Sequence, residues 1–184
     1  MAGAGSDIGR GETVLRRGDL LTSRETGVLA ALGLASVPVV RRPGVAIVST
    51  GNELLAPGQE PRPGMIFDSN ATILADAVCE LGGMPVKLGI VPDDRDALRT
   101  VLQRALEYDL VLLSGGTSKG EGDISYRVVA DLGRPGILAH GVALKPGKPL
   151  CLAAVERPGT ASISSTTHPR QPLFRFSSCN VLLT

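Results

Sequence analysis

Tryptophan is absent from this chain, and aromatic residues make up only 3% of its 184 residues. That scarcity argues against a nucleic-acid platform, which stacks bases on aromatic side chains. The formal net charge is only +1, so no global field attracts nucleic acid or an anionic membrane. The chain also lacks a signal-peptide pattern and any run of about 20 apolar residues. We therefore expect neither a nucleic-acid nor a membrane partner.

Cysteine is almost as rare, with three residues and neither a CxxC pair nor the Cys/His spacing of a metal site. Cys79 falls in a helical pattern and Cys151 in an apolar run, which is typical of small core residues. Their odd number predicts no disulfide framework, and a reducing cytoplasm is the expected location. What the chain does have is 43% hydrophobic residues, enough for one domain with a real core.

Apolar runs alternate with helical periods beyond Pro43 and Gly44. Buried strands are expected at residues 45–50, 86–91, 110–113 and 150–155. Helices are expected to begin near Asp68–Asn70, at Asp93 or Asp94, and at Asp123. This alternation predicts an α/β fold with three layers, α/β/α, and a mostly parallel sheet covered on both faces.

The residues on either side of this block have a different pattern. Upstream, Thr22 or Ser23 can cap a helix that continues to about Leu32. Downstream, the segment from Gly159 is rich in Ser, Thr and Pro and shows no clear period. We therefore divide the chain into residues 1–42, a core domain at 43–155, and an irregular segment at 156–184.

The loop after residues 110–113 has the most informative composition, Ser114-Gly-Gly-Thr-Ser-Lys-Gly-Glu-Gly-Asp123. With so little side-chain bulk, its backbone N–H groups can approach an anion closely. Glu121 stands where a Walker A motif needs its lysine, and no GxGxxG follows a strand. The loop therefore matches neither a standard P-loop nor a dinucleotide fingerprint.

Three acids, Glu53, Asp93 and Asp123, follow strands of the predicted sheet. Taken singly, each is more often a helix cap or a solvated loop acid. In a parallel sheet they share the edge at which ligands bind, so they can converge. Converging carboxylates repel one another unless a cation joins them, and hard oxygen ligands favour Mg²⁺. Lys145 and Lys148, two of only four lysines, suit a phosphate or another oxyanion, although both can also be solvated loop residues.

These motifs occur in a fixed order along the chain. They are Ser49-Thr-Gly-Asn-Glu-Leu54, Asp68-Ser-Asn70, Gly89-Ile-Val-Pro-Asp-Asp94, the loop from Ser114 to Asp123, and Lys145-Pro-Gly-Lys-Pro149. Together, over roughly Gly5 to Leu152, they resemble the molybdopterin molybdenumtransferase family. Related adenylyltransferases and CinA-like nucleotide hydrolases share the core domain. The segment around Asp7, with Gly18-Asp-Leu-Leu21 and the residues from Gly27 to Gly33, favours the molybdenumtransferases.

The resemblance implies the molybdopterin-binding fold and a transferase that consumes adenylylated molybdopterin and molybdate, releases AMP and requires Mg²⁺. It implies catalytic roles for Asp7, Glu53, Asp93 and Asp123, of which the last three would hold the metal. Asp7 would act from a neighbouring domain, and because family members are dimers the resemblance allows a homodimer, although most of the contacting domains are not in this chain. The implied substrate-binding residues are Thr50, Gly51, Asn52, Asp68, Asn70, Ser114, Gly115, Gly116, Ser118, Lys145 and Lys148.

The chain also departs from the family's pattern. Family members are longer, and Glu156-Arg-Pro-Gly-Thr160 stands near the place of a Pro-Gly-Asn-Pro type turn. We therefore expect a fragment with weak or no activity on its own, and a non-native, frameshifted end at Gly159–Thr184. The alternatives are a non-catalytic module that binds molybdopterin or AMP, and a CinA-like hydrolase domain.

Overall fold

The structure is a computed structural model that describes residues 7–115, 122–141, 150–156 and 179–183. The chain forms two compact units, Met1–Arg41 and Arg42–Thr184. The expected three-part division of the chain stays a prediction. In the described part of the chain, no helix is long and apolar enough to cross a membrane.

The first unit contains one helix, α1 (Ser23–Ala31), within its described residues. Thr22 caps it, and the Thr22 side chain and the Glu25 carboxylate satisfy backbone donors of the first turn in a capping box. Hydrogen bonds from the Thr22 side chain and backbone hold the pKa of Glu25 below its ordinary value. The helix expected between Thr22 or Ser23 and Leu32 is thus confirmed.

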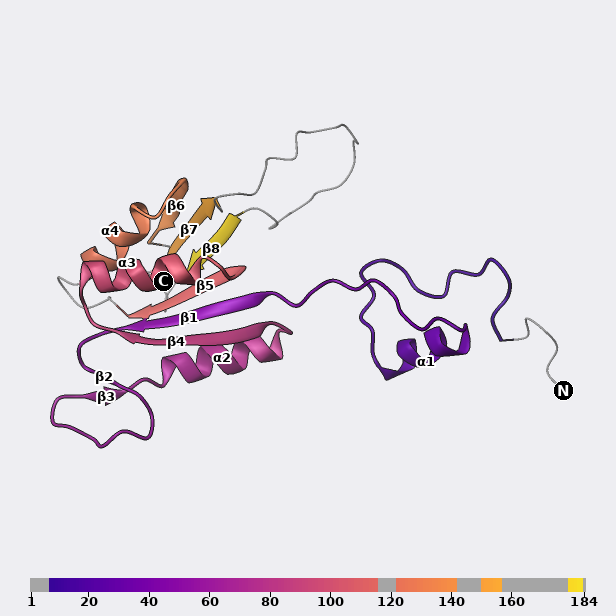
Figure 1. The fold of residues 1–184 in the computed structure, drawn as a ribbon, viewed down its shortest axis with the longest axis horizontal. Coiled ribbons are helices and arrows are strands. Elements are labelled where there is room, and N and C mark those ends of the chain that lie inside the picture. Colours follow the sequence, from indigo (N-terminus) through magenta and orange to yellow (C-terminus); the bar gives the residue numbers. More distant parts are fainter. Residues whose placement is uncertain (1–6, 116–121, 142–149, 157–178, 184) are drawn as a thin grey trace. The chain divides into compact units, whose positions relative to one another are not determined.

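The second unit is built on a six-stranded sheet in the order β4-β1-β5-β8-β7-β6 (Figure 1). Its strands are β1 (Gly44–Thr50), β4 (Met84–Val91), β5 (Leu110–Gly115), β6 (Pro135–His140), β7 (Cys151–Glu156) and β8 (Cys179–Leu183). β4, β1, β5 and β8 are parallel neighbours. Every residue of Val45–Thr50 is buried, because β1 is central and covered on both faces.

Within the described residues, three helices cover the sheet. α2 (Asn70–Glu80) packs on β1 and β4 from one face, while α3 (Arg95–Ala105) and α4 (Gly122–Ala130) lie on the other (Figure 1). Leu98, Leu102 and Val128 pack against the sheet and are almost fully buried. The expected three-layer α/β/α architecture is confirmed.

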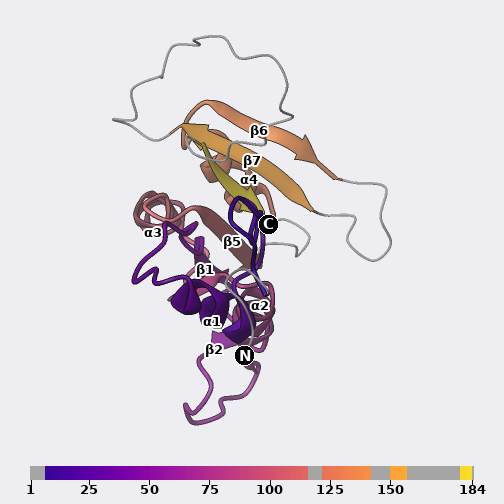
Figure 2. The same ribbon diagram turned by 90° about the vertical axis from the view of Figure 1, so that its right-hand side faces the viewer.

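The far side of the sheet differs from the expected arrangement. The sheet was expected to be mostly parallel without a direction being assigned to β7, which runs antiparallel to both β8 and β6 (Figure 2). β6 itself was not expected. β8 lies within the segment expected to be irregular, so that expectation does not hold for Cys179–Leu183. A strand of five residues beyond an unpatterned stretch carries too little periodicity to be recognised from sequence.

A small two-stranded arm projects beside the start of α2. Its strands are β2 (Leu54–Leu55) and β3 (Ile66–Phe67), which pair in parallel. The amide of Ile66 donates to the carbonyl of Glu53 (2.8 Å), and that of Asp68 to the carbonyl of Leu55 (2.9 Å). The arm therefore joins the loop after β1 to the helix α2.

Candidate functional site

Three parallel strands end level with one another at the edge where ligands are expected. Thr50, the last residue of β1, is paired with Val91 of β4 on one side and with Gly115 of β5 on the other. The amide of Gly51 then donates to the carbonyl of Val91 (3.2 Å). The loops after β1, β4 and β5 therefore leave the sheet side by side, as the sequence pattern predicted for a parallel sheet.

Asp93 joins two of these loops through both of its carboxylate oxygens. Oδ1 accepts a hydrogen bond from the Thr50 hydroxyl (2.9 Å), and Oδ2 accepts one from the amide of Asn52 (3.0 Å). In return, the amide of Asp93 donates to Oδ1 of Asn52 (3.2 Å). We call Thr50, Asn52 and Asp93 the loop clamp. Asp94, rather than Asp93, caps α3 by accepting from the amide of Ala97 (2.8 Å).

Glu53 lies next to this clamp and is exposed. Its carboxylate lies over Gly51 so closely that a Cβ built on Gly51 would be 2.8 Å from Oε2. Within the described residues, the Glu53 carboxylate has neither a hydrogen bond nor an ion pair. It is therefore free to bind a cation or a donor on a ligand.

Gly115 occupies a position where only glycine fits. Its φ is +120°, and a Cβ built on it would be 2.0 Å from the carbonyl oxygen of Thr50. No contact with backbone is tolerated at that distance, and backbone cannot swing aside as a side chain can. The last residue of β5 thus has to be glycine before the Gly-rich loop begins.

The start of α2 is fixed to the same edge. The Asn70 side-chain amide donates to the Ser114 hydroxyl (3.0 Å), which ties α2 to the end of β5. Asp68 is 6% exposed, and its Oδ1 accepts from the amide of Ala71 (3.0 Å) in the first turn of α2. The expected helix start is therefore confirmed, with Asp68 supplying a cap-like hydrogen bond.

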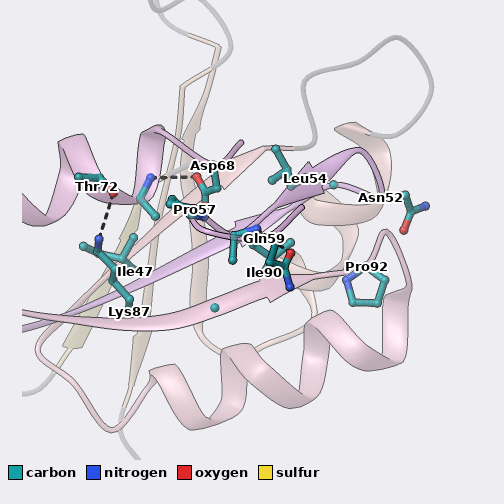
Figure 3. A pocket seen from close by; sticks show the side chains of 14 residues that line it. Ile47, Asn52, Leu54, Pro57, Gln59, Asp68, Thr72, Lys87, Ile90 and Pro92 are labelled. Carbon is teal, nitrogen blue, oxygen red and sulfur yellow. Dashed lines mark hydrogen bonds between the residues drawn. The ribbon is translucent and has the colours of Figure 1, made fainter. Parts of the chain in front are cut away.

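A pocket of about 490 Å³ opens between β1, β4, the start of α2 and the two-stranded arm (Figure 3). Gly51, Asn52 and Asp68, all predicted to bind substrate, contribute to its wall. Lys87 and Gln59 also line it, and the sequence did not single out either. In the sequence, Lys87 is notable only as one of four lysines, and its position within an expected strand gave no indication of a binding role.

Other predicted site residues lie outside the described residues or in the other unit. Gly116, Ser118, Lys145 and Lys148 are outside the described residues, as is the side chain of Asp123. Asp7 is exposed and belongs to the first unit. Because β7 is antiparallel, His140 and Cys151 are paired at the same edge as Thr50, and the amide of Gly141 donates to the carbonyl of Leu150 (3.0 Å). β6 thus ends and β7 begins at this edge.

The described side chains do not by themselves form a metal site of three acids. Among them, no group of three or more His, Cys, Asp or Glu residues is placed to hold a metal ion. Glu53 and Asp93 nevertheless lie on adjoining loops, which the loop clamp holds together. The roles expected for these two acids stay predictions.

Comparison with known proteins places the chain among molybdenum cofactor proteins. A family described as "Probable molybdopterin binding domain" matches residues 46–168. Molybdopterin molybdenumtransferase 2 from Mycobacterium tuberculosis is 36% identical over 182 residues, which are 94% of this chain and 44% of that protein. Molybdopterin molybdenumtransferase from Nostoc is 40% identical over 149 residues, which are 80% of this chain and 34% of that protein.

Solved structures agree with this relationship. Two structures of molybdopterin biosynthesis MoeA proteins from Pyrococcus horikoshii are each 32% identical to the chain, with TM-scores of 0.74 and 0.61. The match covers 97% and 80% of this chain, but 39% and 35% of those chains. The chain thus spans less than half the length of the relatives it matches.

Proposed function

The chain belongs to the family of molybdopterin-binding domains, and on that premise we propose that it forms the molybdopterin-binding core of a molybdopterin molybdenumtransferase. Such an enzyme transfers molybdenum from molybdate to adenylylated molybdopterin and releases AMP. One observation supports this most strongly: Glu53, Asp93 and the start of the Gly-rich loop share the edge where β1, β4 and β5 end in register. That arrangement puts acids beside an anion-binding loop.

We propose that Glu53 and Asp93 would hold Mg²⁺, which would supply positive charge beside the substrate's phosphates. The Glu53 carboxylate suits such an ion because it is exposed and, within the described residues, unpartnered. Asp93 accepts two hydrogen bonds, but a carboxylate offers about four lone-pair sites, so a metal can still bind. Asp123 would complete the set. Bound Mg²⁺ supplies charge stabilisation as the phosphoanhydride is cleaved.

The remaining expected residues fit around this core. Lys145 and Lys148 would hold phosphate or molybdate, since molybdate is an anion that bare carboxylates repel. Gly116 and Ser118 would donate to the pterin phosphate, and Asp7 would join from its own unit. The odd number of cysteines, without CxxC or metal-site spacing, supports a reducing, cytoplasmic location. A homodimer is likewise a proposal from the resemblance.

Calorimetric titration of the chain with adenylylated molybdopterin tests this function. We expect saturable binding that Mg²⁺ strengthens, because the metal neutralises charge between the acids and the phosphates. AMP release is followed in parallel, with and without molybdate. No binding in the presence of Mg²⁺ and molybdate would contradict the proposal, whereas binding without AMP release identifies a module that binds but does not catalyse.

A further inference from the structure

The pocket beside the clamp has the dimensions and the walls of a site for a flat organic ring. Its volume of about 490 Å³ falls within the range of roughly 300–1,000 Å³ that is typical of small-molecule sites. Ile47 and Ile90 come from the sheet, Leu54 and Pro57 from the arm, and Pro92 from the loop after β4. These residues give the pocket apolar walls, as the close view shows (Figure 3).

Asp68 is the buried acid of this pocket. It is only 6% exposed, although an ionised carboxylate is costly to bury without partners. Its Oδ1 accepts from the amide of Ala71, and within the described residues its Oδ2 has no hydrogen-bonding partner. A carboxylate held rigidly in this way can still accept two neighbouring N–H groups from a ligand.

Lys87 lines the same pocket from β4. Its Nζ donates to the Thr72 hydroxyl (3.1 Å), which directs the ammonium toward the start of α2 (Figure 3). An ammonium carries three donors, so two remain for a ligand. The pocket therefore combines an acceptor of two hydrogen bonds with a positively charged donor, set between apolar walls.

We propose that this pocket binds the pterin ring of the substrate by its 2-amino-4-oxo edge. The Asp68 carboxylate accepts from the 2-amino group and from N3–H, and Lys87 donates to the 4-oxo oxygen. The assignment rests on the proposed function, in which the phosphate of the same substrate is bound by the Gly-rich loop. The pocket would then hold the pterin ring of that substrate. Guanine carries the same donor–donor–acceptor edge, so the test has to separate the two rings.

Fluorescence titration with pterin and with lumazine tests the assignment. Lumazine has a 2-oxo group in place of the 2-amino group, so it would turn an acceptor toward Asp68. We expect the unaltered chain to bind pterin at least about tenfold more tightly than lumazine, because a hydrogen bond to a charged group is lost and a repulsion is gained. In Asp68→Asn, an amide N–H replaces one acceptor and the preference should disappear or reverse.

The matched control is Asp76→Asn, which removes the same charge from an exposed position on α2, the helix that follows Asp68. It should keep the preference for pterin, and circular dichroism shows whether both variants are folded. Equal binding of pterin and lumazine by the unaltered chain would overturn the assignment, as would an unchanged preference in Asp68→Asn. Tighter binding of GMP than of pterin would also overturn it, in favour of a guanine nucleotide.

The same variants separate this assignment from the proposed function. If Asp68→Asn binds adenylylated molybdopterin as tightly as the unaltered chain does, the pterin assignment is wrong and the proposed function stands. If the unaltered chain binds pterin with the expected preference but does not bind adenylylated molybdopterin, the proposed function fails and the pocket's ring specificity stands.

Discussion

Gly115→Ala should lower the free energy of unfolding by at least about 3 kcal/mol, which is the range of a severe substitution. The new Cβ would be placed 2.0 Å from the carbonyl oxygen of Thr50, in the middle of the sheet. The residue would also have to keep a φ of +120°, which L side chains rarely adopt. The chain has to separate β1 from β5 to relieve this contact. Urea unfolding followed by circular dichroism measures the loss.

Gly89→Ala is the matched control for this substitution. Gly89 also lies in a strand and has a φ of +98°, but nothing is within 4 Å of the Cβ that alanine would add. Only the backbone strain remains, so we expect a loss of about 1–2 kcal/mol. Equal losses for the two variants would show that the close approach of Gly115 to Thr50 does not exist in solution.

Asp93→Asn should have the largest effect on binding. The amide keeps the shape of the side chain, but the Thr50 hydroxyl would have to change from donor to acceptor and the Asn52 amide would lose a charged acceptor. We expect a loss of about 2 kcal/mol in the free energy of unfolding. Binding of adenylylated molybdopterin should weaken at least about tenfold, because the loop clamp weakens and a proposed metal ligand is lost.

Asp94→Asn supplies the comparison one residue away. Asp94 caps α3, and asparagine caps helices about as well as aspartate, so stability and binding should change little. A double-mutant cycle that combines Asp93→Asn with Thr50→Val isolates the hydrogen bond between Thr50 and Asp93. We expect a coupling free energy of about 1 kcal/mol. Additive effects of the two substitutions would mean that the clamp is not formed.

Much of the sheet could be predicted because its central strands are covered on both faces. Residues 45–50, 86–91 and 110–113 are apolar runs between helical periods, and this alternation fixes parallel neighbours. The hydrophobic pattern of β7 does not indicate whether the strand runs parallel or antiparallel to its neighbours. The short connection from His140 to Cys151 did carry the information, since parallel neighbours need a crossover of a dozen or more residues.

The sequence predicted the edge of the sheet at which the site lies, but it did not predict the contacts between the residues of the site. Placing Glu53 and Asp93 required only the rule that ligands bind where parallel strands end. Asp93 and Asp94 are adjacent acids, and either could cap α3 on sequence grounds; the Thr50 hydroxyl and the Asn52 amide decide between them. The pocket at Asp68 and Lys87 could not be foreseen, because the arm and β4 meet there only in the folded chain.

We propose that the substrate binds where β1, β4 and β5 end together. Amide chemical shifts of the ¹⁵N-labelled chain, recorded as adenylylated molybdopterin is added with Mg²⁺, test it directly. We expect the largest saturable changes at Gly51, Asn52, Asp93 and Gly115, with Asp93→Asn suppressing them. Changes confined to the opposite edge of the sheet, near Gly44 and Met84, would contradict the claim.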